Sequence, residues 1–193
     1  MKTIGLTGLI GSGKSLICSV FEHLGIPVFL SDNYAKELYK DTSFLEEIVS
    51  VFGQEVFNKG VLDKNILANI VFNDKEKLEK LNSMVHPKVL EMFLLWSKNR
   101  QAPYVILESA ILFEIGWEKY FDKTICISTP KDIAIERALK RDKVSKQDIE
   151  KRMSNQFSNE DKCKRADFII FHDNKTMLLP QILEIHNKIK QKE

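Results

Sequence analysis

The amino-acid sequence predicts an α/β fold built on a five-stranded parallel sheet. Five short apolar runs have the continuous hydrophobicity of strands that are covered on both faces. Segments with helical periodicity separate these runs. A glycine-rich loop lies between the first run and the first helical segment, which is how a βαβ unit begins. The runs are Thr3 to Thr7, Val28 to Leu30, Tyr104 to Leu107, Thr124 to Ile127 and Phe168 to Phe171.

The remaining segments predict helices. Ser15 to Leu24 has helical spacing and ends before Gly25 and Pro27. Between the second and third strands no strand pattern is found, and three helices are expected there. The first is capped by Asp63, the second begins near Asn73, and the third begins at Pro87, since proline is favoured at the first helical position.

Two further helical segments complete the chain. A charged helix pair, with Ser145 as a cap, is expected from Pro130 to Arg165, and a terminal helix from Asn174 to Lys190, although Pro180 would kink it or mark a later start. The pattern predicts one doubly wound domain. Its core is expected over residues 1–40, 101–130 and 166–193. The helical insertion over 41–100 is the best candidate for a substrate-binding subdomain, and the charged helices over 131–165 would be either a mobile lid or only a solvated face.

Composition excludes several classes of protein. The 193 residues carry 29 basic and 27 acidic side chains, a net charge of +2, so no global field attracts nucleic acid or an anionic membrane. No apolar stretch approaches the length of a membrane span, and glycines interrupt the N-terminal apolar run too early for a signal peptide. Three widely spaced cysteines suggest neither a disulfide framework nor a zinc site. We expect a cytoplasmic protein, a monomer or weak homo-oligomer, without nucleic-acid or membrane partners.

Residues Gly8 to Ser15 carry the strongest functional signal. They fit the Walker A pattern, Gly-Xaa4-Gly-Lys-Ser/Thr, in the strand-loop-helix context that the pattern requires. Such a P-loop wraps phosphate groups with its backbone N–H groups, at the positive end of the next helix. ATP and Mg²⁺ are therefore expected as cofactors, with Lys14 bridging the β- and γ-phosphates and the Ser15 hydroxyl binding the metal ion. The expected nucleotide-binding residues are Gly11, Ser12, Gly13, Lys14, Ser15 and Leu16.

Acidic residues lie at the ends of expected strands. Asp32 follows the second strand and Glu108 ends the third, so both are expected at the sheet edge where the ligand binds. Asp32 would deprotonate or orient an acceptor hydroxyl or contact the metal through water, or it would only cap the helix over Asn33 to Tyr39. Glu108 would act on the Mg²⁺ shell, or would be only a charge at a strand end. Glu114 is a weaker candidate.

Basic residues supply the other candidates. Arg137 and Arg141 are four residues apart and share one helix face, where two guanidinium groups could bind phosphate charge. Arg152 and Gln156 repeat that spacing on the following helix, where they could equally be only surface residues. His86 is a candidate for acceptor binding or a packing residue. The predicted catalytic residues are Asp32, Lys14 and Arg141, and the predicted substrate-binding residues are Asp32, His86, Arg137 and Glu108.

Together these residues resemble the dephospho-CoA kinase family along nearly the whole chain. Leu6 to Ser15 is similar to the family's Leu-Thr-Gly-Gly-Ile-Gly-Ser-Gly-Lys-Ser, and Glu108 to Glu114 to its Asp-Xaa-Pro-Leu-Leu-Phe-Glu. Shorter similarities are Asp32, His86-Pro87, Arg137 to Asp142, Arg152 to Gln156 and Ala166-Asp167. The resemblance implies transfer of the ATP γ-phosphoryl group to the ribose 3′-hydroxyl of dephospho-CoA, which gives CoA and ADP in the last step of CoA synthesis. It also implies that Asp32 is the base, that the insertion holds the acceptor and that the charged helices form the lid.

The chain departs from the family pattern at four places. Leu9 stands where Gly is usual, Glu108 replaces Asp, and Ala110 replaces Pro. The usual Asn-Xaa-Gly after the last strand is His172-Asp173-Asn174. Leu9 is one of the free positions of the P-loop, and Glu108 keeps the negative charge, so neither departure changes the expected chemistry.

Composition and spacing alone reach only a P-loop kinase. Another small-molecule kinase of this type, such as a nucleoside monophosphate kinase, shares the sheet, the lid and the chemistry. A GTPase-like switch needs an Asn-Lys-Xaa-Asp motif, and the nearest string, Asn58-Lys59-Gly60-Val61, lacks the Asp. A module that binds nucleotide without turnover is a third alternative.

Overall fold

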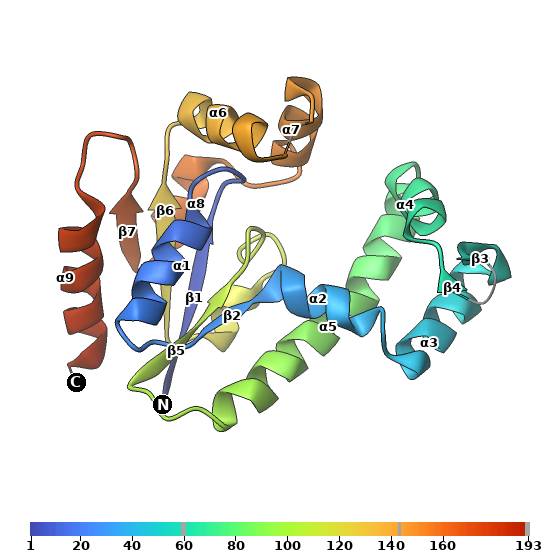
Figure 1. Ribbon diagram of the computed structural model, residues 1–193, viewed down its shortest axis with the longest axis horizontal. Coiled ribbons are helices and arrows are strands. Elements are labelled where there is room, and N and C mark those ends of the chain that lie inside the picture. Colours follow the sequence, from blue (N-terminus) through green and yellow to red (C-terminus); the bar gives the residue numbers. More distant parts are fainter. Residues whose placement is uncertain (59–60, 143, 192–193) are drawn as a thin grey trace. The chain divides into compact units, whose positions relative to one another are not determined.

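The computed structural model describes residues 1–58, 61–142 and 144–191 (Figure 1). The chain forms two compact units, one made of Met1–Leu30 and Arg100–Glu193 and the other of Ser31–Asn99. Residues 59–60 of the predicted insertion, residue 143 of the predicted lid and residues 192–193 of the predicted core lie outside the described residues. Within the described ranges no helix is both long enough and apolar enough to cross a bilayer.

The first unit contains a five-stranded sheet in the order β2-β5-β1-β6-β7, and every neighbouring pair is parallel. β1 lies in the middle of the sheet, with β5 and β2 on one side and β6 and β7 on the other, and helical segments connect the strands, as a doubly wound fold requires. All five predicted strands are confirmed, to within two residues at each end. They are β1 (Lys2–Gly8), β2 (Val28–Leu30), β5 (Tyr104–Glu108), β6 (Lys123–Ser128) and β7 (Phe168–Phe171).

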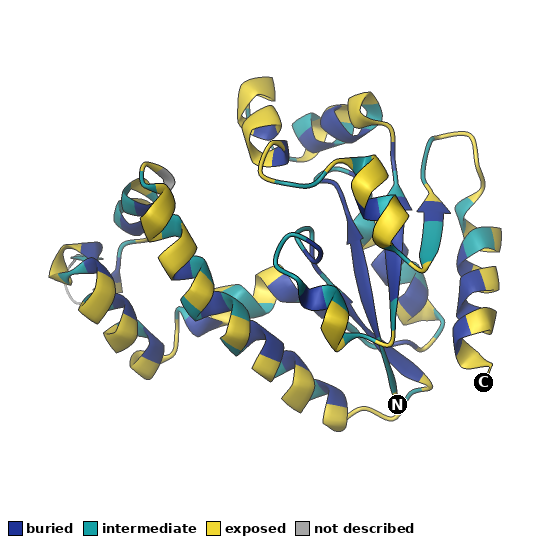
Figure 2. Cartoon of the chain, turned by 180° about the vertical axis from the view of Figure 1, so that it is seen from behind, coloured by how far each residue is buried: buried dark blue, intermediate teal, exposed yellow. Residues whose placement is uncertain are grey.

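Helices cover both faces of this sheet (Figure 1). On one face, Ile4 and Leu6 of β1 pack with Ile17 and Phe21 of α1 and with Ile182 of α9 in one buried cluster. On the other face α8 packs against β6 and β1. Figure 2 shows the strands largely buried and the helices exposed along one side. The helices are α1 (Lys14–His23), α6 (Lys131–Asp142), α7 (Lys146–Met153), α8 (Asn159–Arg165) and α9 (Leu178–Lys190), with a short 3₁₀ turn over Trp117–Tyr120.

The charged segment after β6 forms three helices, where the sequence predicted a pair. Ser145 caps α7 as predicted, and a capping box forms with Asp148. The additional helix, α8, starts at its own cap, because the Ser158 hydroxyl accepts the Asp161 N–H. Helix α9 begins at Leu178, so the predicted later start is confirmed and Pro180 falls in the first turn, where a missing N–H costs little.

The second unit is mainly helical. It begins at Ser31, earlier than the predicted residue 41, because α2 packs against α5. A small antiparallel hairpin, β3 with β4, was not predicted, since strands of two residues show no periodicity. Asp63 caps α4 as predicted. The elements are α2 (Ser31–Leu38), α3 (Thr42–Phe52), a 3₁₀ turn (Gln54–Val56), β3 (Phe57–Asn58), β4 (Val61–Leu62), α4 (Lys64–Phe72) and α5 (Lys75–Lys98).

Helix α5 continues through Pro87, so the predicted boundary there was wrong. A buried apolar stripe at four-residue spacing, Leu81, Val85, Val89 and Phe93, runs past the proline on both sides. Pro87 itself is exposed. Burial of the stripe outweighs the hydrogen bond that a proline removes from a helix, and one long helix forms where two were expected.

Candidate active site

All five strands of the first unit are parallel, so their carboxyl ends lie at one edge of the sheet. Four of them lead directly into residues of the candidate site. The P-loop follows β1, Glu108 ends β5, Thr129 follows β6 and His172 follows β7. Within the sheet Leu6 of β1 pairs with Glu108. The sheet thus gathers at this edge residues that are up to 160 positions apart, as in the pair His172 and Ser12.

The P-loop has the backbone that phosphate binding needs. Gly11 and Gly13 have φ angles of 77° and 91°, in the region that favours glycine. Gly13 is the N-cap of α1, and the Ser12 N–H donates to the Leu9 carbonyl over 3.0 Å. Lys14 and Ser15 lie in the first turn of α1, where backbone N–H groups point toward the N-terminal end of the helix and can donate to a phosphate.

Lys14 lies between the loop and an acidic strand end. Its Nζ donates to the carbonyl oxygens of Gly8 and Leu9, each over 3.2 Å, and lies 3.7 Å from Glu108 Oε1. Both charged side chains are 12 % exposed, so solvent screens the pair only in part. The structure therefore brings together the predicted Lys14 and Glu108 beside the predicted nucleotide-binding loop.

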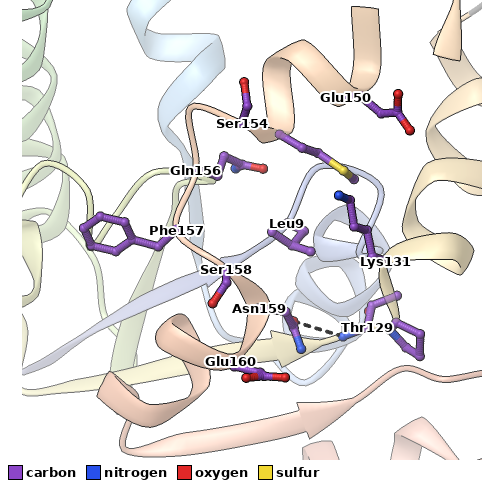
Figure 3. Close-up of a pocket in the computed structure, with 12 residues that line it drawn as sticks. Leu9, Thr129, Lys131, Glu150, Ser154, Gln156, Phe157, Ser158, Asn159 and Glu160 are labelled. Atoms are coloured by element: carbon purple, nitrogen blue, oxygen red, sulfur yellow. Dashed lines mark hydrogen bonds between the residues drawn. The ribbon is translucent and has the colours of Figure 1, made fainter. Parts of the chain in front are cut away.

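Leu9, one of the four departures, fills a space between the P-loop and the charged helices. It packs with Ala134 and Ala138 of α6 and with Ile149 and Met153 of α7 in a buried cluster. Leu9 has no positive φ, so the loop does not require glycine there. Beside it is a cavity of about 510 Å³, which also reaches α8; Figure 3 shows Leu9 in the middle of the lining side chains.

Arg137 of α6 contacts the segment after β7. Its Nη1 lies 2.9 Å from His172 Nδ1, and its Nη2 contacts the Asn174 side-chain oxygen. His172 Nδ1 also lies 2.8 Å from the Ser12 carbonyl oxygen, so the ring lies against the P-loop. Burial lowers the pKa of His172, although the Ser12 contact partly opposes this, and the nearby Arg137 charge lowers it further. The ring is therefore mainly neutral at neutral pH.

Asn174 accounts for another departure. Its φ is 65°, and it is the only residue other than glycine with a positive φ in the described part of the chain. Asparagine tolerates this conformation better than most residues, so it can stand where the family has glycine. Asp173 holds the turn by accepting the N–H groups of Lys175 and Thr176. These bonds lower the pKa of Asp173 to about 2.

Arg141 has a different partner from Arg137, although both are on α6. Its Nε and Nη2 donate to the two carboxylate oxygens of Asp142, over 2.6 and 2.9 Å. Arg152 Nη1 approaches the same carboxylate at 3.8 Å. The Arg141 hydrogen bonds lower the pKa of Asp142. The Arg141 side chain is 60 % exposed.

Gln156 joins the P-loop to the segment after β5. Its Oε1 accepts the Ile10 N–H over 3.0 Å, and its Nε2 donates to the Ala110 carbonyl over 2.8 Å. These two bonds connect three segments that are distant in the sequence. Gln156 is therefore not the surface residue that one interpretation of the sequence allowed.

The same Ala110 carbonyl also accepts Lys162 Nζ, over 2.9 Å. Lys162 is fully buried and forms an ion pair with Glu114 at 2.6 Å, while Glu114 also accepts the Phe157 N–H at 2.7 Å. Sequence reasoning weighed Glu114 as a weak candidate and missed Lys162. No local pattern separates Lys162 from the other charges of α8, since its partner lies 48 positions away.

Asp32 and His86 belong to the second unit. Asp32 is exposed and is the second residue of α2, so it lies in the first helical turn and is not the N-cap that was considered, because the helix begins at Ser31. His86 lies on α5 and is half-buried, and burial lowers its pKa. Its burial is consistent with the packing interpretation and does not exclude a binding role.

Comparisons with known proteins point to one family. The sequence model of the family described as "Dephospho-CoA kinase" matches residues 2–178 of this chain. The chain is 38 % identical over 191 residues to a dephospho-CoA kinase of Bacteroides fragilis, covering 98 % of this chain and 93 % of that protein. A dephospho-CoA kinase structure from Campylobacter jejuni is 31 % identical, with a TM-score of 0.68 and coverage of 97 % and 96 %. A structure from Thermus thermophilus is also 31 % identical, with a TM-score of 0.84 and coverage of 97 % and 95 %.

We expect Lys162→Met to lower the free energy of unfolding by about 3–5 kcal/mol, because it leaves the Glu114 carboxylate buried without its counter-ion. Urea unfolding followed by circular dichroism measures this loss. Adding Glu114→Gln should recover part of the stability, since glutamine can still accept the Phe157 N–H without a charge. Lys140→Met is the matched control, because its pair with Glu136 is exposed, and it should leave the midpoint nearly unchanged. A Lys162→Met protein as stable as the wild type would contradict the structural role of this pair.

Proposed function

This chain belongs to the dephospho-CoA kinase family, and we propose that it transfers the γ-phosphoryl group of ATP to the ribose 3′-hydroxyl of dephospho-CoA, giving CoA and ADP. The observation that carries the proposal is the Walker A loop, Gly8 to Ser15, between β1 and α1 of a chain that matches the family over residues 2–178. We also propose that the protein acts in the cytoplasm, as a monomer or weak homo-oligomer, on these small substrates and not on nucleic acid or at a membrane.

The nucleotide is proposed to bind with its phosphates in the P-loop. Gly11 to Leu16 would surround the phosphates, with backbone N–H groups of the loop donating to the phosphate oxygens, and the positive pole of α1 adds to the attraction. Lys14 would exchange its contacts with the Gly8 and Leu9 carbonyls for the bridging β- and γ-oxygens. Its ammonium already lies beside the loop, so a side-chain rotation is sufficient.

Mg²⁺ is proposed as the metal ion, held by the Ser15 hydroxyl and by Glu108 directly or through water. The residues fit a hard cation, because Ser15 is exposed at the start of α1 and the Glu108 carboxylate already faces the Lys14 ammonium at 3.7 Å. When bound, the ion would neutralise charge on the phosphate oxygens. Glutamate in place of aspartate keeps the oxygen ligand on a longer side chain.

The acceptor is proposed to bind to the helical insertion, with His86 and Arg137 among its contacts. Its 3′-oxygen forms a bond to the γ-phosphorus as the bond to the bridging oxygen breaks, and ADP leaves. Asp32 would take the proton of the attacking hydroxyl. Asp32 comes two residues after the end of β2 in the chain, and β2 and β1 are parallel strands of the same sheet, which supports this assignment.

The lid is proposed to comprise α6, α7 and α8 and to use Arg141 on the developing phosphate charge. Arg141 is the more exposed of the two predicted arginines and is held by Asp142, a neighbour in sequence. An exposed ion pair of this kind is weak enough to exchange for a phosphate. Arg137, which is bound to His172 and Asn174, would contact substrate from the side of the last strand.

Purified protein should release ADP in multiple turnovers with ATP and dephospho-CoA, and not with AMP, dTMP, shikimate or water as acceptor. A coupled ADP assay measures this. A nucleoside monophosphate kinase would respond to AMP or dTMP, and a binding module would give no turnover.

Lys14→Ala should abolish transfer in the same assay, because charge compensation at the bridging oxygens is lost. Near-normal turnover of folded Lys14→Ala would overturn the P-loop assignment.

Asp32→Asn should retain the fold and ATP affinity but slow single-turnover transfer to dephospho-CoA by about 10²–10⁴-fold, the usual range of general-base help. The structural cost is small, since loss of a charge in the first turn of a helix removes about 0.3–1 kcal/mol. Rate, ATP affinity and thermal midpoint are measured on one preparation. A decrease of less than about tenfold would exclude Asp32 as the base. A parallel loss of ATP affinity would instead indicate a role in the metal shell.

Arg141→Ala should lower kcat much more than it weakens binding of ATP, because a lid arginine meets phosphate charge mainly in the transition state. Steady-state kinetics and equilibrium titration with a fluorescent ATP analogue separate the two effects. Lys140→Ala is the control, since it neutralises the adjacent exposed charge on α6. If kcat of Arg141→Ala equals that of the control, Arg141 is only a surface residue.

A further inference from the structure

Two cysteines lie together on the face of the sheet that α8 covers. Cys126 is fully buried in β6, and Cys163 on α8 is partly buried. Their Sγ atoms are 3.2 Å apart, and both thiols are free. The flanking Ile125 and Ile127 belong to the cluster on the opposite face, with α1 and α9. The thiol pair therefore lies on the face of the sheet opposite α1.

The two thiols differ in their surroundings. The contact with Cys126 lowers the pKa of Cys163 to about 7; burial opposes this shift, and a hydrogen bond with the Ser128 hydroxyl supports it. The contact between the two thiols, together with burial, raises the pKa of Cys126 well above its usual range. A thiolate that is partly accessible is the reactive form of cysteine, whereas a buried thiol is inert until a neighbour is activated.

We propose that Cys163 and Cys126 form a modification site that reacts with hydroperoxides and closes to an intramolecular disulfide. The geometry that carries the proposal is the 3.2 Å contact between the sulfur of a partly exposed residue on a helix and the sulfur of a buried residue on the adjacent strand. The third cysteine is excluded from this chemistry, since Cys18 is buried on α1 and burial raises its pKa strongly.

The reaction balances in two steps. The Cys163 thiolate attacks one oxygen of the hydroperoxide, the O–O bond breaks, and the alkoxide takes a proton from solvent, leaving a sulfenic acid on Cys163. The Cys126 sulfur then attacks the Cys163 sulfur, the S–O bond breaks, and the Cys126 proton leaves with the hydroxide as water. Both thiols are oxidised and one hydroperoxide is reduced to an alcohol.

Cys126 has a protective role in this scheme. A sulfenic acid that meets no second thiol is oxidised further to sulfinic acid, which is not reduced by ordinary thiols. Closing the bond requires the sulfurs to approach from 3.2 Å to about 2.05 Å. Only a small movement of α8 is needed, and α8 is a short helix of seven residues.

The test uses the full-length protein and hydrogen peroxide, with intact and peptide mass spectrometry as the readout. Wild-type protein should lose two hydrogen atoms, give a peptide cross-link between Cys126 and Cys163, and regain its mass with dithiothreitol. Cys126→Ala should instead gain oxygen atoms at Cys163, and Cys163→Ser should gain none at the same dose. Cys18→Ala is the matched control and should behave as the wild type.

The outcomes separate cleanly. Oxygen adducts on wild-type Cys163 without a cross-link, disulfide-linked dimers, or a cross-link that involves Cys18 would each overturn the proposal. The thermal midpoint of every variant is measured first, and Cys163→Ser keeps the test valid if the buried Cys126→Ala variant unfolds. Because the readout is mass and not turnover, the result does not depend on the proposed kinase activity.

Discussion

The P-loop lies so close to two later segments of the chain that only glycine fits at two of its positions. A Cβ atom at Gly11 would overlap the Ala134 carbonyl of α6, and one at Gly13 would overlap the His172 ring after β7. Both glycines also have positive φ angles. The same backbone that turns N–H groups toward a phosphate therefore lets the first lid helix and the last loop pack directly against it. The placement of Arg137 follows, since it is held by that last loop.

Hydrogen bonds and one buried ion pair support the other side of the P-loop. The Gln156 side chain accepts the Ile10 N–H and donates to the Ala110 carbonyl. The same carbonyl accepts Lys162 Nζ, which also donates to the Glu114 carboxylate. Removing two charges from water is costly, and only tight geometry with several hydrogen bonds compensates for it. Few other side-chain arrangements would satisfy all of these hydrogen bonds. The network therefore fixes the position of the P-loop rather than adding to the free energy of unfolding.

Two of the departures from the family pattern, Leu9 and the segment His172-Asp173-Asn174, concern packing around the P-loop. Leu9 adds apolar contacts between the P-loop and the helices of the proposed lid without disturbing the backbone. Asn174 takes the left-handed conformation that a glycine usually supplies. The corresponding change to His172 brings a mainly neutral ring to the P-loop, in contact with the Ser12 carbonyl and Arg137. These substitutions thus change the side chains that pack around the P-loop and not the backbone conformation of the loop.

The sequence alone determined the five strands, the P-loop and its setting, the caps at Asp63 and Ser145, and the family, because periodicity, caps and loop motifs are local signals. Only the tertiary structure decided that α5 passes through Pro87, that Lys162 pairs with Glu114, and that Cys126 meets Cys163. Each of these depends on burial or on a partner far away in the sequence: the partners of Lys162 and Cys163 are 48 and 37 positions away. Local preferences cannot encode such contacts, since their energy arises only when distant segments exclude water together.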